Sequence, residues 1–309
     1  MRIGFAGSPE FADTILSALI DAKLNIVRVL TQPPRPYGRG KKVRPTPVNT
    51  QADLVGIECV TPTTLRGQEH LVSDLDILVV AAYGLILPSS FLNTPRYGSV
   101  NAHASLLPRW RGASPIEHAI LHLDERTGVS LMQITKGLDA GPVYESRSIP
   151  ISCSDTAESI TVKLATLAGD MMVKFIQKLH EGKAGQPVPQ AASEAVYAPR
   201  LTTADARIDW KKDAVHVHAQ IRAFQGRSSV WTTVGDVRIK VLEAQICDGC
   251  FEPGLLYASK AGVIVGCGSQ GLNLKIVQLN LGKGKPLPIK AAMNGYRQIF
   301  ANGIRWEYP

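Results

Sequence analysis

Two polar residues, Asn101 and His103, stand two positions apart in the otherwise apolar segment SVNAHA. An extended chain places residues i and i+2 on the same face of a sheet, so the amide and the imidazole would point to the same side. Such a pair can donate hydrogen bonds to the oxyanion of a tetrahedral intermediate. A structural histidine beside a turn-forming asparagine is the alternative that these two residues leave open.

A carboxylate follows in the segment KGLDAG, where Asp139 lies between two glycines. An aspartate in such a place is most often a turn residue. We expect the hairpin that carries it, formed by GVSLMQI and PVYESRSIPI, to return to the sheet edge of Asn101 and His103. The carboxylate would then stabilise a charged imidazole or take up protons through water.

A second unusual segment is TQPPRPYGRGKKVRPTPV, residues 31–48, which is far longer than the usual strand-to-helix connection of about 2 to 6 residues. It holds the five cations Arg35, Arg39, Lys41, Lys42 and Arg44. A basic loop beside the carboxyl ends of the strands suits binding to phosphates near an active site. A merely solvated loop is the alternative.

The net charge of +8 is concentrated in the last third of the chain. Residues 200–309 hold 15 Lys and Arg against 8 Asp and Glu, whereas residues 1–199 hold 19 against 18. This asymmetry favours a polyanionic partner for the C-terminal third, although a basic surface kept for solubility would have the same composition.

The composition is that of a globular protein, with 45% hydrophobic and 19% charged residues among 309. The sequence has neither a run of about 18 apolar residues nor the features of an export signal, so we expect no membrane association and a cytoplasmic location. Among the five cysteines only Cys247 and Cys250 have the spacing of metal ligands, and a second pair is missing. We therefore expect reduced thiols and no metal.

Residues 1–150 alternate short β-branched runs with helical patterns, which predicts an α/β fold with a doubly wound, mainly parallel, Rossmann-like sheet. Ser8, Ser114 and the pair Asp155 and Glu158 are the expected N-terminal caps of helices. The first strand and turn, GFAGSPE, lack the G-x-G-x-x-G spacing, and the second strand ends without a carboxylate. A nicotinamide-dependent enzyme is therefore disfavoured.

The stretch EGKAGQPVPQAASEAVYAPR has little periodicity and predicts a linker. Beyond it the sequence predicts a helix at about 211–225 and five or six short strands, which together indicate a small, OB-like β-barrel. We therefore expect a first domain over residues 1–181, a linker over 182–205 and a β-barrel domain over 206–309.

The run NAHASLLPRWRGASPIEHAI, followed by ITKGLDAGPV, resembles the formyltetrahydrofolate-dependent transferase family, and the similarity extends essentially end to end. The Asn-x-His-x-Ser-Leu-Leu-Pro run with a later Leu-Asp-Ala-Gly is highly specific to that family. The resemblance implies that Asn101, His103 and Asp139 form a catalytic trio and that 10-formyltetrahydrofolate is the co-substrate, without a metal. It further implies a folate pocket lined by Ser105, Leu106, Leu107, Pro108 and the backbone near Tyr83, Gly84 and Leu87.

The basic loop, the segment APRLTTADARIDW and the C-terminal β domain resemble the members of the family that act on methionyl-initiator tRNA. This implies that the loop with Arg39 enters the acceptor arm of the tRNA, and that the first domain binds the folate while the barrel binds tRNA. The implied tRNA-binding residues are Arg35, Arg39, Lys41, Lys42, Arg44 and Arg200, and Arg200 stands where the family usually has a lysine.

Two other functions remain open from the sequence. One is folate-dependent formyl transfer to a small amine, such as a glycinamide ribonucleotide or an amino sugar, which would need the trio but not the basic C-terminal domain. The other is a non-catalytic RNA-binding protein with the same fold. We expect a monomer in each case.

Overall fold

The computed structural model describes residues 1–37, 42–268, 271–282 and 285–308, which divide into two compact units. Unit 1 consists of Met1–Pro115, Arg126–Pro150 and Thr161–Ala198, and unit 2 consists of Ile116–Glu125, Ile151–Ile160 and Pro199–Pro309. The chain therefore passes from one unit to the other several times, and each unit is described by itself.

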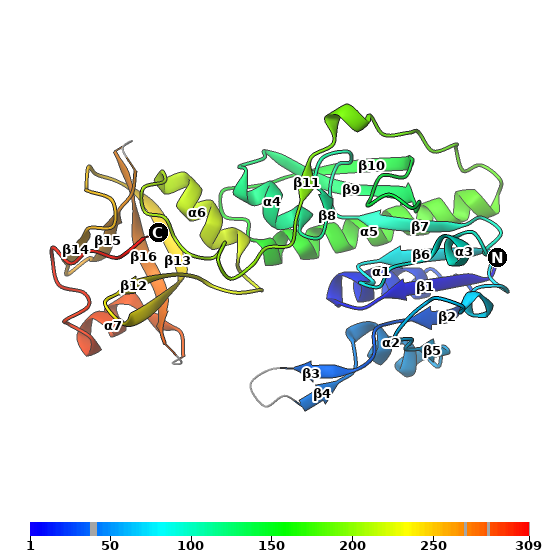
Figure 1. Ribbon diagram of the computed structural model, residues 1–309, viewed down its shortest axis with the longest axis horizontal. Coiled ribbons are helices and arrows are strands. Elements are labelled where there is room, and N and C mark those ends of the chain that lie inside the picture. Colours follow the sequence, from blue (N-terminus) through cyan, green and yellow to red (C-terminus); the bar gives the residue numbers. More distant parts are fainter. Residues whose placement is uncertain (38–41, 269–270, 283–284, 309) are drawn as a thin grey trace. The chain divides into compact units, whose positions relative to one another are not determined.

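Unit 1 is built on a seven-stranded sheet whose order is β10-β9-β7-β6-β1-β2-β5 (Figure 1). Its strands are β1 (Ile3–Gly7), β2 (Ile26–Leu30), β5 (Cys59–Val60), β6 (Ile77–Ala81), β7 (Ser99–His103), β9 (Arg126–Gln133) and β10 (Val143–Pro150). The pairings from β5 to β7 are parallel, and β9 joins β7 and β10 in antiparallel fashion. The predicted mainly parallel α/β sheet is confirmed, with the predicted hairpin at its edge.

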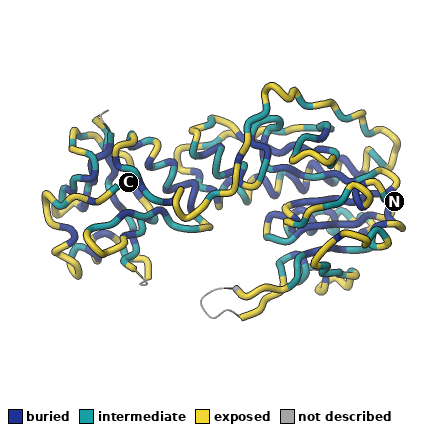
Figure 2. Tube along the Cα trace, viewed as in Figure 1, coloured by how far each residue is buried: buried dark blue, intermediate teal, exposed yellow. Residues whose placement is uncertain are grey.

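Helices cover this sheet and bury its central strands. They are α1 (Glu10–Asp21), α2 (Pro47–Val55), α3 (Ser89–Leu92) and, from Thr161 on, α5 (Ala157–His180), with short 3-10 turns at Glu69–Leu71 and Ala192–Glu194. The helix α4 (Pro115–Leu121), except Pro115, and the first turn of α5 belong to unit 2. All residues of β1 and β6 are buried, as Figure 2 shows in dark blue, because apolar residues occupy both faces of these strands. Within the described ranges, none of the helices combines the length and the apolar character needed to span a membrane.

The start of α1 differs from the prediction. Its N-cap is Pro9, without a side-chain cap, and Ser8 has another role. The Ser8 hydroxyl donates to the carbonyl oxygen of Tyr83 at 3.2 Å and accepts from the backbone N–H of Gln32 at 3.2 Å. Ser8 thus joins the ends of three neighbouring strands, because long-range partners take the hydroxyl that local capping would have used.

The cap of α5 is displaced by one residue from the predicted pair. Thr156 Oγ1 accepts from the N–H of Ser159 at 3.1 Å, and Ser159 Oγ accepts from the N–H of Thr156 at 3.0 Å. This reciprocal pair is a capping box in which serine replaces the usual Glu or Gln. Asp155 instead accepts from the N–H of Ser152 at 2.9 Å and so fixes the turn before the helix.

The basic segment contains a two-stranded hairpin that the sequence did not indicate. Strand β3 (Arg35–Tyr37) pairs antiparallel with β4 (Lys42–Arg44), and Arg35 stands opposite Arg44. Figure 1 shows this hairpin extending from the part of unit 1 that holds β2 and α2. Arg39 and Lys41 lie outside the described residues.

Residues 182–198 of the predicted linker belong to unit 1. Val188 forms an isolated antiparallel bridge with Val143, and β11 (Tyr197–Ala198) pairs in parallel with β8 (Arg111–Gly112). Single pairs of residues hold this segment, which explains why it has no periodic pattern that a sequence analysis could detect.

Unit 2 contains the predicted antiparallel β structure. The strands are β12 (Val230–Val234), β13 (Val237–Asp248), β14 (Leu256–Ser259), β15 (Gly262–Gly266), β16 (Leu272–Leu281) and β17 (Leu287–Pro288), and the helices are α6 (Ala214–Ala223) and α7 (Ile289–Gly295). The sheet order is β12-β13-β16-β15-β14, and β17 pairs with β16.

The C-terminal segment completes this sheet. The N–H of Glu307 donates to the carbonyl of Thr233 in β12 at 2.8 Å, while the N–H of Leu256 in β14 donates to the carbonyl of Ile304 at 2.8 Å. Trp306, between these contacts, has 0% exposure. One short segment therefore pairs with both edge strands, so that the sheet closes into the small β-barrel that the sequence predicted.

Candidate active site

His103 ends β7 with its ring between two oxygen acceptors. The side chain is 6% exposed, and its Nε2 lies 2.9 Å from the carbonyl oxygen of Trp110. Because a carbonyl can only accept, Nε2 carries a proton. The other nitrogen, Nδ1, lies 3.6 Å from Oδ2 of Asp139, beyond a direct hydrogen bond but within the distance of an ion pair. A second ring proton would thus point toward a carboxylate.

Asp139 lies in the turn between β9 and β10, with a positive φ of 45° and a side chain that is 20% exposed. Its Oδ2 also accepts from the backbone N–H of Gly112 in β8 at 2.9 Å. A Cβ atom on Gly112 would lie 2.8 Å from the carbonyl oxygen of Ala198 in β11, and its φ is 121°. The pairing of β8 with β11 therefore requires glycine at the position that holds the carboxylate.

A side chain that the sequence analysis missed, Gln190, supports the same turn. Its Nε2 donates to the carbonyl oxygens of Asp139 at 2.9 Å and Gly141 at 2.7 Å. Its Oε1 accepts from Nε and Nη2 of Arg111 at 3.0 and 2.8 Å. Gln190 is 51 residues from Asp139 and lies in a segment without a motif, so no sequence signal identifies it.

Asn101 lies in the middle of β7, opposite Val80 of β6 and Met132 of β9. It shares a face of the strand with His103, as the two-residue spacing predicted. The side chain is half-buried, and it has no hydrogen bond with any residue that the structure describes. Its amide is therefore available to donate to a substrate, although the catalytic role of this residue stays a prediction.

The loop after β7 carries four of the predicted folate-contacting residues. Ser130 Oγ donates to the carbonyl of Ser105 at 2.8 Å and accepts from the N–H of Leu107 at 3.1 Å, while Ser105 Oγ donates to the carbonyl of Arg109 at 2.6 Å. The Leu107-Pro108 peptide bond is cis. The three hydrogen bonds fix the backbone of the loop. The side chains of its middle residues, Leu106, Leu107 and Pro108, are half-buried.

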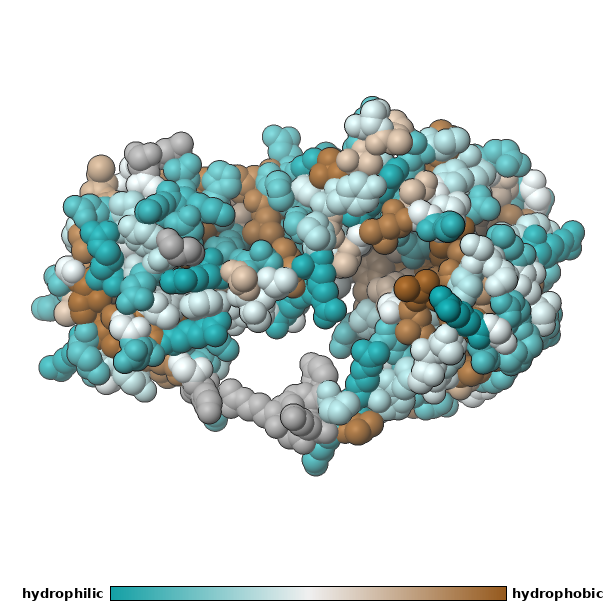
Figure 3. Space-filling view, in the orientation of Figure 1, coloured by the Kyte–Doolittle hydropathy of each residue, from teal (hydrophilic) through white to brown (hydrophobic). Residues whose placement is uncertain are grey.

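The other predicted folate contacts lie after β6. The carbonyl of Tyr83 accepts from Ser8 Oγ and from Gln32 Nε2, and burial raises the pKa of the Tyr83 phenol. Gly84 has a φ of 80°, and Leu87 packs against the buried core cluster around Tyr83. The side chains of Tyr83 and Leu87 thus serve the core, which leaves mainly backbone to contact a ligand. Figure 3 shows a hollow in unit 1 with hydrophobic residues around it.

The described members of the predicted tRNA-binding set are all exposed, namely Arg35, Lys42, Arg44 and Arg200. Arg35, Lys42 and Arg44 belong to the β3-β4 hairpin of unit 1, and Arg200 belongs to unit 2. The structure therefore describes four of the six predicted residues and says nothing of Arg39 and Lys41.

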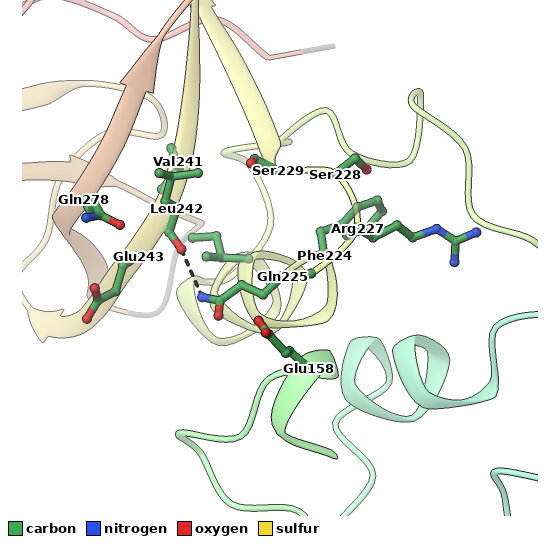
Figure 4. Close-up of a pocket in the computed structure, with 12 residues that line it drawn as sticks. Glu158, Phe224, Gln225, Arg227, Ser228, Ser229, Val241, Leu242, Glu243 and Gln278 are labelled. Atoms are coloured by element: carbon green, nitrogen blue, oxygen red, sulfur yellow. Dashed lines mark hydrogen bonds between the residues drawn. The ribbon is translucent and has the colours of Figure 1, made fainter. Parts of the chain in front are cut away.

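A cavity of about 370 Å³ lies in unit 2 between α6, β13 and the first turn of α5 (Figure 4). None of the predicted site residues lines it. The carboxylates of Glu158 and Glu243 border this cavity, and they would repel the carboxylate groups of a folate. We therefore do not assign the co-substrate to this cavity. Over the described residues, no group of three or more His, Cys, Asp or Glu side chains could hold a metal ion.

Comparisons with known proteins agree with the geometry of both units. A family model described as formyl transferase matches residues 1–176, and a second, described as formyl transferase C-terminal domain, matches residues 200–297. A methionyl-tRNA formyltransferase from Stutzerimonas stutzeri is 44% identical over 309 residues, which cover 98% of this chain and 98% of that protein.

Two solved structures share the fold. A methionyl-tRNA formyltransferase from Clostridium thermocellum superimposes with a TM-score of 0.60 at 15% identity, over 92% of this chain and 100% of that one. An N-formyltransferase from Helicobacter canadensis, in complex with folinic acid and dTDP-3-aminofucose, superimposes with a TM-score of 0.68 at 18% identity, over 89% of this chain and 98% of that one. At these identities the two structures support the fold alone. The two matched domains and the full-length similarity at 44% identity show that the chain belongs to the formyl transferase family and, within it, to the methionyl-tRNA formyltransferases.

Proposed function

We propose that the chain uses Asn101, His103 and Asp139 to transfer a formyl group from 10-formyltetrahydrofolate to the α-amino group of methionyl-initiator tRNA. The activity and the folate co-substrate follow from the family and from the relatives over the full length of the chain. The observation that supports the assignment of the site is the position of His103 between a backbone carbonyl and the Asp139 carboxylate.

The proposed mechanism starts with attack of the methionyl amine on the formyl carbon. The amine has a reference pKa of about 8 and must be neutral to react. Asn101 donates to the oxyanion of the tetrahedral intermediate, and protonated His103, whose Nε2–H is held by the Trp110 carbonyl, stabilises the same charge from its Nδ1 side, where Asp139 holds the imidazolium. Asp139 accepts the amine proton through water, the bond to the folate nitrogen N10 breaks, and N10 takes up a proton as tetrahydrofolate leaves.

The β3-β4 hairpin supports the proposal that this segment binds tRNA. Arg35 stands directly opposite Arg44, and Lys42 is two residues from Arg44, so the three cations share one face of the hairpin. Like charges directly opposite each other destabilise a two-stranded sheet. Such an arrangement is favourable when a polyanion lies against the charged face, and we propose that the acceptor arm of the tRNA does so.

The assignment of domains and surroundings is also part of the proposal. Residues 1–181 would bind the folate and carry out catalysis, and the barrel over residues 206–309 would bind tRNA with its excess of positive charge. Arg200, in the segment between them, would contact the tRNA as well. We propose a monomer that acts in the cytoplasm, where initiator tRNA is used, and light scattering of the purified protein with and without tRNA tests the monomer.

The activity is tested by incubating the protein with 10-formyltetrahydrofolate labelled in the formyl group and with methionyl-tRNA, a glycinamide ribonucleotide or an amino-sugar nucleotide. We expect label only on methionyl-tRNA. Label on a small amine would replace the proposed acceptor, and tRNA binding without any transfer would leave the non-catalytic function.

The catalytic residues are tested with Asn101→Ala, His103→Ala and Asp139→Asn. We expect each to lower kcat by roughly 100-fold or more, because a lost oxyanion donor costs about 3 to 4 kcal/mol in the transition state, while tRNA affinity changes little. Matched controls are Asn93→Ala and His70→Ala, two exposed residues of unit 1 that should keep wild-type rates. Single-turnover rates of the three variants within a few-fold of wild type would remove these residues from the mechanism.

A further variant tests the basic segment. Replacement of Arg39, Lys41 and Lys42 by glutamine should weaken tRNA binding and reduce its salt dependence, since each lost phosphate contact removes roughly one unit from the log-log slope. Binding of the folate should not change. An unaltered salt slope would show that the segment is a solvated loop.

A further inference from the structure

The outer face of the barrel in unit 2 carries a tryptophan between two arginines. Trp231 in β12 stands opposite Lys240 in β13, and the neighbouring pair joins Thr233 to Arg238. The alternate residues of both strands, including Thr232, point inward and are buried. The side chains of Trp231 and Arg238 therefore lie together on the face that is turned away from the barrel core.

A third residue joins them from the segment before α6. The N–H of Ile208 donates to the carbonyl of Trp231 at 2.8 Å, and the N–H of Trp231 donates to the carbonyl of Ala206 at 2.9 Å. Ala206 and Ile208 are buried, so Arg207 between them points to the same outer face as Trp231. The segment thus forms an isolated parallel bridge to β12 and places a second guanidinium group beside the indole.

Distances show that both guanidinium groups contact the tryptophan. The Cζ atom of Arg238 lies 3.8 Å from the centroid of the Trp231 ring, and that of Arg207 lies 5.5 Å from it. Both distances are within the range of a cation–π interaction. The indole Nε1 donates to the carbonyl of Thr203 at 3.3 Å, which helps to fix the ring in place.

Neither guanidinium group is neutralised by a carboxylate of the described part of the chain. Arg227 and Arg305 of the same unit form ion pairs with Glu117 and Glu252, at 2.8 and 2.5 Å. Asp236, in the turn between β12 and β13, forms no ion pair with either arginine among the described residues, and Glu307 accepts from the Thr233 hydroxyl and the N–H of Gly235. The side chains of both arginines on Trp231 thus have no acceptor among the described residues, and the Nε of Arg207 is buried.

These features point to the kind of partner that the surface fits. An arginine stacked on an aromatic ring keeps the N–H groups at its edge available, and its planar fork matches two oxygens of a phosphate. The stack also orders the side chains before binding, which reduces the entropy that is lost when a phosphate is bound. Residues 200–309, which include the three residues, hold 15 Lys and Arg against 8 Asp and Glu, and outer faces of small β-barrels commonly bind nucleic acid.

We propose that Arg207 and Arg238, held on Trp231, form a binding site for phosphates of the tRNA backbone. We call these three residues the arginine-tryptophan stack. The proposal rests on the proposed function, since it assigns one contact surface for the tRNA substrate. The stack would bind the backbone without regard to base sequence, so it would contribute to affinity for tRNA in general rather than to the choice of the initiator tRNA.

The test measures tRNA binding by the full-length protein as a function of salt concentration. The double variant Arg207→Gln/Arg238→Gln should bind tRNA roughly 10-fold more weakly at 100 mM salt, with a log-log salt slope smaller by about one to two units. In formylation assays the kcat/KM of the double variant should fall, mainly because its KM for the tRNA rises. The matched control is Lys260→Gln/Lys290→Gln, which removes two exposed charges of the same unit that do not stack on an aromatic ring.

Single variants separate the stack from simple charge. Arg238→Lys keeps the charge but loses the planar fork, so it should recover only part of the affinity that Arg238→Gln loses. Trp231→Phe should keep most of the affinity, and Trp231→Leu should lose it although both arginines remain. Thermal unfolding of each variant ensures that binding is compared between folded proteins.

Two results would overturn the proposal. Equal slopes and affinities for the arginine and the lysine double variants would show that only overall charge matters. Wild-type affinity in Trp231→Leu would show that the stack is irrelevant. Failure of the proposed function is a separate result, because the wild-type protein would then not formylate methionyl-tRNA, whatever effect the stack variants have on tRNA binding.

Discussion

The side chain of Gln190 links the turn that carries Asp139 to the buried guanidinium group of Arg111, and its replacement tests how the Asp139 carboxylate is positioned. Gln190→Ala removes four hydrogen bonds, two to the carbonyls of the turn and two from Arg111. The Asp139 carboxylate would keep its bond from the N–H of Gly112. The turn itself would lose both anchors that come from residues 182–198.

The size of the effect can be worked out for stability and for catalysis separately. Arg111 is 5% exposed, and a buried charged group that loses its partner costs more than the roughly 1 to 3 kcal/mol of a neutral one. Together with the two lost bonds to the turn, we expect the free energy of unfolding to fall by about 3 to 5 kcal/mol. A displacement of about 1 Å in a catalytic group can cost on the order of 100-fold in rate, so we expect kcat to fall about 10- to 100-fold.

The matched variant Gln190→Glu separates these two effects. A glutamate can still accept from Arg111, now with a charge-assisted bond, but it cannot donate to the carbonyls of Asp139 and Gly141. We therefore expect the stability of Gln190→Glu to be close to that of wild type while its rate falls as far as that of Gln190→Ala.

The assay is single-turnover formyl transfer at saturating folate and tRNA, with urea unfolding of the same samples and tRNA binding as a control. Affinity for tRNA should stay within about two-fold of wild type, because neither variant changes a basic residue. A Gln190→Glu protein that transfers formyl at the wild-type rate would refute the positioning role of Gln190, whatever the stability of the alanine variant.

Two further predictions concern stability and thiol chemistry. Hydrogen bonds from Arg2 and Arg28 lower the pKa of Asp74. The ionised carboxylate therefore stabilises the fold fully at any pH above the ordinary carboxyl pKa near 3.8, and this stabilisation is lost as the pH falls through the lowered pKa. Because these side chains are partly exposed, Asp74→Asn should reduce the free energy of unfolding by about 0.5 to 1 kcal/mol at pH 7. If the urea midpoints of wild type and variant differed by the same amount at pH 7 and at pH 3, the stabilising role of the ionised Asp74 would be contradicted. Burial raises the pKa of the Cys267 thiol to about 12. In the native protein at pH 8, iodoacetamide should therefore label the exposed Cys153 and Cys250 but not Cys267. Peptide mass spectrometry of the labelled protein measures this.

The parts of the fold that the sequence could predict are those with a regular pattern. Apolar runs such as that of β6 and the alternation in β7 predict strands, and the alternation also places Asn101 and His103 on one face. The turn with Asp139 was predicted to return to this edge, and the 3.6 Å between Asp139 and His103 agrees with that prediction. The five short strands of the C-terminal third likewise predicted the barrel, but not the segment around Trp306 that closes it.

The features that the sequence could not predict depend on partners distant in the chain. Ser8 has the position of a helix cap, yet its hydroxyl contacts Tyr83, 75 residues away. The basic segment has the composition of a loop, and its hairpin has a strand with arginine opposite arginine, which β propensity disfavours. For Ser8 a tertiary contact overrides the local preference, and in the hairpin a charged surface does so.

The segment over residues 182–198 shows why composition alone is a poor guide to the extent of a folded unit. Its glycines and prolines disfavour a regular helix or strand, which is also what a linker requires. An extended chain can nevertheless contact a folded surface through isolated residues, here Val188 beside β10, Gln190 at the Asp139 turn and β11 beside β8. Each contact leaves no periodic trace in the sequence, because the residues between them face solvent. The Asp139 carboxylate is held by Gly112, and Gly112 is paired with Ala198, so the geometry of the Asp139 turn depends on the end of this segment rather than on the last residue of α5.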